Sequence, residues 1–191
     1  MIVYKGFDEN MCCNLGKGKY QYRIGHTETE DEAKTRHCGL HASEYVMEAC
    51  SWYPPNGRNR ICICEAQDVD EDGEDIVACK KLTPVKELSM EEICLKALQY
   101  MVKHQKRSWK KSGECFEVEE DKASVSGAGI AIARGEHPRC RGGEGSVLGF
   151  YMEKDGVYVG AVYLVVGPTK GWKPNTWYQM RADHTVIEVE E

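Results

Sequence analysis

The sequence predicts an α+β fold that is mostly antiparallel β, with two helices, a short solenoid-like glycine-rich connector and a C-terminal β meander. Three observations predict it. Alternating apolar and polar residues recur along the chain, as in half-buried strands. Two segments instead show helical spacing, and the stretch from Ala123 to Ser146 is rich in glycine and small residues. We therefore expect an α+β lobe over 1–114, a connector over 115–146 and an antiparallel β lobe over 147–191.

The N-terminal lobe is expected to begin with a strand that ends at Gly6. A helix should follow Ser43, a candidate N-cap, and stop before Pro54, because proline lacks the donor N–H. Further strands are expected over 20–24, 58–67 and 76–79. The most regular helical spacing is an apolar stripe after Ser89, formed by Met90, Ile93, Cys94, Ala97, Leu98 and Met101.

The glycine-rich connector has small residues at short, irregular intervals, at Ser126-Gly127, Arg134-Gly135 and Arg141-Gly142. Short repeats of this kind can stack as coils of a β-solenoid. The alternative is a flexible linker. Alternation of Ile130 and Ile132 with alanines favours an ordered strand. Beyond it, Asp155-Gly156 is typical of a hairpin turn within the β lobe.

Composition excludes several classes of protein. No segment approaches ~20 consecutive apolar residues, so we expect no membrane span. The N-terminus has no signal-peptide pattern, which favours a cytoplasmic location and reduced thiols for the 10 cysteines. A net charge of −6 makes general nucleic-acid binding unlikely, although local basic patches are compatible with it.

Two stretches have residues that could bind a metal ion. His37, Cys38 and His41 lie close together, but a site there would need another ligand from elsewhere. Asp68–Asp72 with Gly73 matches the first half of a calcium loop, but its twelfth position is Cys79 instead of a glutamate. We expect an acidic hairpin loop there, and no metal or cofactor overall.

Glycine-flanked arginines are the first candidates for ligand contacts, because backbone N–H groups approach phosphate closely there and Arg binds it in a bidentate manner. The alternative is that they are solvated or pair with Glu136 and Glu144. The candidate ligand-binding residues are Arg134, Arg139, Arg141, His41, Trp172 and Lys173.

Several motifs resemble a group of uncharacterised phage and prophage proteins. These are Tyr4-Lys5-Gly6-Phe7, Tyr20-Gln21-Tyr22, Gly39-Leu40-His41-Ala42, a shortened set of Gly/Ser/Ala repeats and Lys173-Pro174-Asn175-Thr176-Trp177-Tyr178. Val166-Gly167-Pro168-Thr169 departs from the Val-Asp-Gly usual in that group. The resemblance implies a phage-related origin and an intracellular site of action. It implies no enzymatic activity, because none is known for that group.

Three functions are compatible with these patterns. The first is an accessory protein that binds a host factor stoichiometrically, in host takeover or counter-defence, with Trp172 and Trp177 as anchors. The second is a protein that sequesters a small anionic nucleotide or second messenger. The third is an ADP-ribosyltransferase-like enzyme that uses Glu117 and Glu119, or Glu188 and Glu190. We expect a binding protein rather than an enzyme, and name no catalytic residue.

Overall fold

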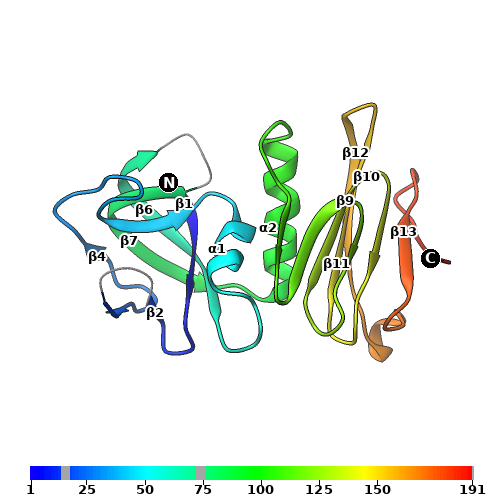
Figure 1. Cartoon of the computed structure of the whole chain (residues 1–191), viewed down its shortest axis with the longest axis horizontal. Helices are drawn as coiled ribbons and strands as arrows, with labels where there is room; N and C mark the ends of the chain where they lie inside the picture. The colour runs from blue at the N-terminus through cyan, green and yellow to red at the C-terminus, as the bar shows by residue number, and fades with distance from the viewer. Residues whose placement is uncertain (14–17, 72–75, 191) are drawn as a thin grey trace. The chain divides into compact units, whose positions relative to one another are not determined.

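The structure is a computed structural model that describes residues 1–13, 18–71 and 76–190. The chain forms two compact units, Met1–Ser89 and Met90–Glu191 (Figure 1). Both are built mainly from antiparallel strands, and each contains one α-helix, which confirms the predicted α+β class. The predicted boundaries at 114/115 and 146/147 stay predictions. No helix in the described part of the chain is long and apolar enough to cross a membrane.

Unit 1 is an antiparallel sheet whose pairings close on themselves. β1 (Ile2–Phe7) pairs with β6 (Arg60–Glu71), β6 with β7 (Ile76–Glu87), β7 with β5 (Leu40–Ser43), and β5 with β1 through Tyr4 and Ser43. β4 (Glu28–Thr29) adds to β7, while β2 (Cys12–Cys13) and β3 (Tyr20–Gln21) form a separate pair. The closed circuit gives this short chain a core that is surrounded by strands. Its buried residues include Val3, Phe7, Tyr22, Cys62, Cys64, Cys79 and Leu82.

Helix α1 (Val46–Trp52) matches the predicted helix, but its start differs from the prediction. The N-cap is Tyr45, and no side chain caps the helix there. Ser43 was the predicted cap and lies instead at the end of β5. The pairing of Ser43 with both Tyr4 and Ile76 explains the difference, because two ladder contacts hold this residue in the sheet.

In unit 2, helix α2 (Met90–Lys103) packs against β10 (Ile130–Arg141), β11 (Val147–Lys154) and β12 (Val157–Val165). The predicted apolar stripe supplies its buried face. Gly149 permits the close approach, since a Cβ there would lie 2.8 Å from the Cys94 sulfur. The helix therefore covers one face of the sheet, and Gly149 is the point at which it approaches the sheet closely.

The glycine-rich stretch is ordered and solenoid-like. β9 (Phe116–Ser124), β10 and β11 follow one another in the chain and pair in parallel, with Phe116 beside Ile130 and Ile130 beside Val147. Because consecutive strands run in the same direction, the chain must return to the starting end of the sheet after each strand, as it does in the coils of a solenoid. Asp121, with a positive φ of 59°, and Gly135 lie where the β9–β10 register shifts. Gly143 stacks on Gly127 of the preceding coil, where a Cβ would lie 2.9 Å from the Gly127 Cα.

Two antiparallel hairpins complete the sheet of unit 2. β11 and β12 meet at Asp155-Gly156, where both residues have positive φ, as the predicted turn requires. β13 (Trp177–Met180) pairs with β14 (Val186–Val189) and, on its other side, with Arg139 and Cys140 of β10. A short 3₁₀ turn, Pro168–Lys170, leads into β13, and β8 (Lys111–Gly113) pairs with β9. β10 thus contacts β11 with its first half and β13 with its second.

Candidate functional site

The larger of the two cavities described lies in unit 1 and measures about 850 Å³. It opens beside β1, β5 and α1, and its lining combines aromatic rings with a few basic groups. The lining residues used below are Lys5, Tyr20, Tyr22, Glu30, Arg36, His37, His41, Trp52 and Tyr53. Volumes of roughly 300–1,000 Å³ are typical of small-molecule sites.

Close packing between β1 and α1 shapes one side of this pocket. A Cβ at Gly6 would lie 2.6 Å from the Tyr53 Cβ, so only glycine lets the end of α1 approach the strand. Side chains alternate along a strand, which places Gly6 on the face toward Tyr53 and Lys5 on the opposite face with Val3 and Phe7. The backbone of β1 therefore directs a lysine into the core of unit 1.

Lys5 is the most unusual group of the pocket, because its side chain is charged and only 8% exposed. Its Nζ donates a hydrogen bond of 2.5 Å to the carbonyl oxygen of His41. The same nitrogen lies 5.4 Å from the centroid of the Tyr22 ring and 6.0 Å from that of Phe7. No carboxylate pairs with it among the described residues. Burial lowers the pKa of Lys5, because a charged ammonium is disfavoured away from water.

His41 connects this lysine to the rim of the pocket. Its Nε2 accepts a hydrogen bond of 3.1 Å from the backbone N–H of Arg36, so the proton of the neutral ring is on Nδ1. Burial and, after it, the nearby Lys5 charge lower the pKa of His41. The ring is therefore neutral at pH 7. Its position in β5 brings one predicted ligand-binding residue into the pocket.

Tyrosines form the aromatic wall. The Tyr22 ring lies 5.0 Å from that of Phe7 and 5.0 Å from that of Tyr20. Burial raises the pKa of Tyr22 far above its usual range, so its hydroxyl keeps its proton. The wall is neutral, and the charge in the pocket comes from Lys5, Arg36 and Glu30.

Arg134, the first of the three predicted arginines, lies elsewhere and has an internal partner. It is 6% exposed, and its Nη2 lies 2.8 Å from Glu153 Oε2 and donates to the carbonyl oxygen of Gln105 at 3.1 Å. Its guanidinium stacks between the rings of Trp109 and Tyr151, at 5.1 and 4.7 Å from their centroids. Arg134 therefore connects the end of α2 to the sheet.

Arg139 and Arg141 lie on the second half of β10, half-buried and without an ion pair in the described part of the chain. Arg139 Nε donates to Gln179 Oε1 at 2.9 Å, and the Arg141 guanidinium lies 4.9 Å from the centre of the Trp177 ring. Neither they nor Arg134 line either pocket described.

Trp172 and Lys173 lie together before β13. Trp172 is half-buried and packs edge-on against Tyr178 at 5.0 Å, while the exposed Lys173 forms an ion pair of 3.0 Å with Glu188. The glutamates considered for catalysis also have partners: Glu119 pairs with Lys110, and Glu117 accepts the N–H of Ser124. These contacts describe internal roles for Lys173, Glu117, Glu119 and Glu188.

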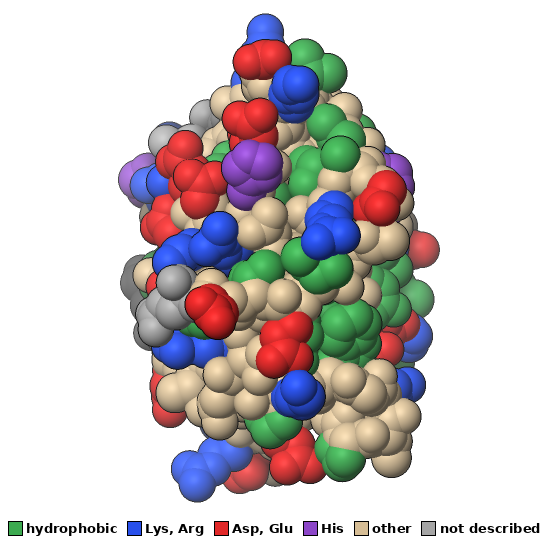
Figure 2. Space-filling view, turned by 90° about the vertical axis from the view of Figure 1, so that its right-hand side faces the viewer, with side chains coloured by type: hydrophobic (Ala, Val, Ile, Leu, Met, Phe, Trp, Pro, Cys, Tyr) green, Lys and Arg blue, Asp and Glu red, His purple; other side chains and the backbone are tan. Residues whose placement is uncertain are grey.

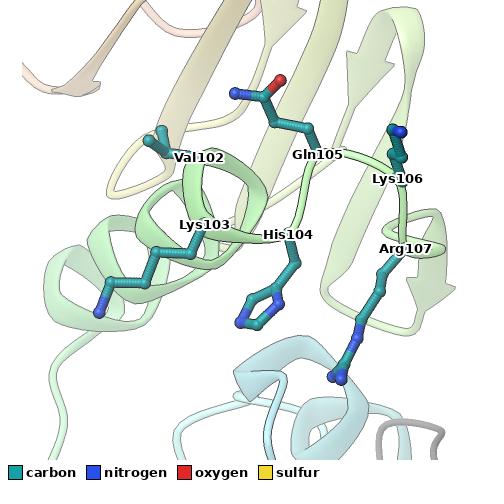
Figure 3. A pocket seen from close by; sticks show the side chains of 6 residues that line it. All are labelled: Val102, Lys103, His104, Gln105, Lys106 and Arg107. Carbon is teal, nitrogen blue, oxygen red and sulfur yellow. The ribbon is translucent and has the colours of Figure 1, made fainter.

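The smaller pocket, of about 380 Å³, lies at the end of α2 (Figure 3). Lys103, His104 and Arg107 extend to one side of this turn, while Gln105 extends to the other. Lys103 lies in the last turn of α2, where a cation interacts favourably with the helix dipole.

No group of three or more potential metal ligands occurs among the described residues. The acidic stretch considered for calcium is only partly described, because Asp72 and Gly73 lie outside the described residues. Asp68–Glu71 form the end of β6, and the Asp70 carboxylate accepts the N–H of Thr35 at 2.7 Å.

The sequence analysis missed Lys5 and the tyrosines as site residues. The signal was present: Lys5 alternates with Val3 and Phe7 in an expected strand, and alternation puts all three side chains on one face. Lysine is nevertheless rarely fully buried unless paired, so alternation alone does not predict this arrangement.

Unit 1 is thus a closed antiparallel β-module with a helix and a lysine-containing aromatic pocket. The chain belongs to the family described as "Domain of unknown function (DUF7666)", whose model matches residues 1–97. That range holds all of unit 1 and the first part of α2, and therefore the whole pocket. No curated protein and no solved structure matched the chain.

Proposed function

We propose that unit 1 binds a small anionic ligand that carries a planar ring, of the nucleotide or second-messenger type. The observation that carries this proposal is the Lys5 ammonium, which is buried beside an 850 Å³ pocket with no carboxylate partner among the described residues. In this proposal the anionic group of the ligand contacts Lys5, and the ring packs on the tyrosines.

The energetic argument concerns charge burial. A buried ammonium is costly unless it is paired, and the group otherwise loses its proton. A single carbonyl acceptor and two aromatic rings offset only part of that cost. A bound anion would complete the pairing and raise the pKa of Lys5 again, so ligand binding should be coupled to proton uptake at pH values between the free and the ligand-bound pKa.

The lining favours one kind of anion. Tyr20, Tyr22, Tyr53 and Trp52 offer ring faces, and Arg36 and His37 offer further donors. Glu30 is the acidic residue of the lining, so the pocket has an excess of basic groups in a unit that is acidic overall. A ligand that joins a ring to a phosphate matches both features.

The test is binding of nucleotides to the full chain. A thermal-shift screen with mono-, di- and cyclic nucleotides should give a clear rise in Tm with at least one of them, because a ligand at 100 times its Kd stabilises by about 2.7 kcal/mol. Calorimetry on that ligand in two buffers of different ionisation enthalpy should reveal proton uptake.

The matched variants are Lys5→Met and Lys80→Met. Lys80 is an exposed strand lysine of the same unit, so its replacement changes net charge equally without touching the pocket. Lys5→Met should weaken binding by about tenfold or more, since loss of a buried charged contact costs roughly 2–5 kcal/mol. Lys80→Met should bind as the native chain does. Absence of any shift, or equal affinity of Lys5→Met, would contradict the proposal.

Binding of a host factor by a phage-derived protein in the cytoplasm remains a second proposal, and it rests on the sequence resemblance alone. Its test is affinity capture with the full chain from host lysate, with a Trp172→Ala chain as comparison. A specific partner that both chains recover equally would argue against Trp172 as an anchor, and recovery of none would argue against the idea.

A further inference from the structure

A cluster of cations lies on one face of the sheet in unit 2, on strands that contribute no residue to the pocket lining. Register places Lys122 of β9 beside Arg139 of β10, and Arg139 beside Gln179 of β13. Alternation puts Arg141 on the same face as Arg139, while Cys140 between them is buried in the core. We call Lys122, Arg139, Arg141, Trp177 and Gln179 the basic sheet face.

The cations of this face lack acidic partners in the described part of the chain. Arg139 donates through Nε to the neutral Gln179 amide, which leaves both of its terminal nitrogens free for a ligand. Lys122 Nζ and the Arg141 guanidinium lie 5.3 and 4.9 Å from the centre of the same Trp177 ring. One indole is therefore in contact with two cations, whose charge is not compensated by a carboxylate among the described residues.

Trp177 supplies an independent observation. Its side chain is buried, with 9% exposed, and its Nε1–H has no hydrogen-bond partner within the residues described. A buried donor without a partner is destabilising. Strand alternation puts this indole on the same face as the cations, and an acceptor with negative charge would compensate those cations.

We propose that the basic sheet face is a binding site for a small oligophosphate group, such as a pyrophosphate or triphosphate moiety, distinct from the unit 1 pocket. Arginine terminal nitrogens bind phosphate oxygens in pairs, and a lysine adds a point charge. Several cations spread over two adjacent strands, about 4.8 Å apart, suit more than one phosphate.

A long polyanion suits this surface less well. Figure 2 shows the side of the molecule on which β13 lies, and its Lys and Arg side chains are interspersed with Asp, Glu and hydrophobic ones. A nucleic-acid strand extending beyond the basic sheet face would therefore meet acidic side chains, in a chain whose net charge is −6. The positive charge is confined to a small area, and the ligand that we propose is correspondingly small.

The experiment titrates the full chain with pyrophosphate and with tripolyphosphate, using calorimetry and the indole N–H resonances. The Trp177 resonance is assigned by its loss in Trp177→Phe. We expect saturable binding and a shift of that resonance. The double variant Lys122→Gln/Arg141→Gln should bind at least tenfold more weakly.

Two controls locate the site. Lys154→Gln/Lys170→Gln removes the same charge from exposed positions of unit 2 and should bind as the native chain does. Lys5→Met should also bind pyrophosphate normally, because the pocket of unit 1 is not involved. This control separates failure of the present inference from failure of the proposed function.

Four outcomes would overturn the inference. They are no saturable binding, an equal loss in both double variants, loss of binding in Lys5→Met, and binding of a single-stranded oligonucleotide without binding of pyrophosphate. The second would indicate non-specific attraction, and the third would assign the anion to unit 1.

Discussion

Lys5 in unit 1 and Arg134 in unit 2 are both basic, both on strands and both nearly inaccessible, at 8% and 6% exposed. They differ in what surrounds the charge. Arg134 has Glu153, the Gln105 carbonyl and two stacked rings, so its charge is neutralised within the chain, although its buried Nη1 has no hydrogen-bond partner among the described residues. Lys5 has a carbonyl, two rings and an open pocket.

The difference teaches how to separate structural from functional buried cations. A cation neutralised from within stabilises the fold, whereas a cation that faces a cavity without a carboxylate is held at a cost that a ligand can offset. Perturbed pKa values and a cavity together make a group a candidate for function. The contacts of Arg134 are those of a structural cation, whereas the open pocket beside Lys5 is what supports the binding role proposed for it.

The largest effect expected from this comparison is a loss of stability when Arg134 is replaced. Arg134→Met should lower the free energy of unfolding by about 2–3 kcal/mol in urea denaturation, because it leaves Glu153 partly buried without its partner. The side chain of Glu153 is 23% exposed, which keeps the loss below that of a fully buried pair. Adding Glu153→Gln should recover part of it. A loss no larger than that of the exposed control Lys154→Met would break the comparison.

Lys5→Met should behave differently, with a free energy of unfolding within about 1 kcal/mol of the native chain at pH 7. Removal of a buried ammonium favours folding, while loss of the bond to the His41 carbonyl opposes it. A loss as large as that of Arg134→Met would show that Lys5 has a structural role instead.

The free energies of unfolding of the native chain and of Lys5→Met should also differ in their dependence on pH. Because the pKa of Lys5 is lower in the folded state than its ordinary 10.5, the unfolded chain holds more protons between these two values. The native chain should therefore gain stability relative to Lys5→Met as the pH rises through that window. Urea denaturation of both chains at a series of pH values measures the difference, and a constant difference would contradict it.

A smaller effect concerns His41. Its pKa should lie below 6.5 in an NMR titration of the full chain, because burial and Lys5 both disfavour the charged ring. A lowered pKa in the folded state means that stability is lost as the pH falls below 6.5. In Lys5→Met the pKa should rise only in part, since burial is the larger cause. A complete return to 6.5 would show that Lys5 alone lowers the pKa.

The smallest effect is expected at Tyr151, which packs on Arg134. Its buried hydroxyl has no hydrogen-bond partner in the described structure, so Tyr151→Phe should cost no stability and should raise the free energy of unfolding slightly, by up to about 1 kcal/mol. Tyr178→Phe is the matched comparison, because that hydroxyl accepts from the Lys173 N–H at 2.7 Å and donates to its carbonyl. It should cost about 1 kcal/mol. An equal cost at Tyr151 would reveal a bound water or ion.

Local patterns were sufficient for much of the fold. Spacing of apolar residues identified α2 and the body of α1, and Asp155-Gly156 identified the hairpin, since both signals arise from neighbouring residues. Alternation around Ile130 predicted an ordered strand in the glycine-rich stretch. The N-cap failed because Ser43 is held by strands that begin far from it in sequence.

The sequence by itself therefore determined the two helices, the Asp155-Gly156 hairpin and the class of fold, because these depend on periodicity and turn chemistry along a few residues. Only the tertiary structure decided the role of each cation. Glu153 lies 19 residues from Arg134 and Gln179 lies 40 residues from Arg139, and the pocket around Lys5 is assembled from residues between Tyr4 and Ile76. Neutralisation and burial are set by strand pairing across such separations, and no local pattern encodes that pairing.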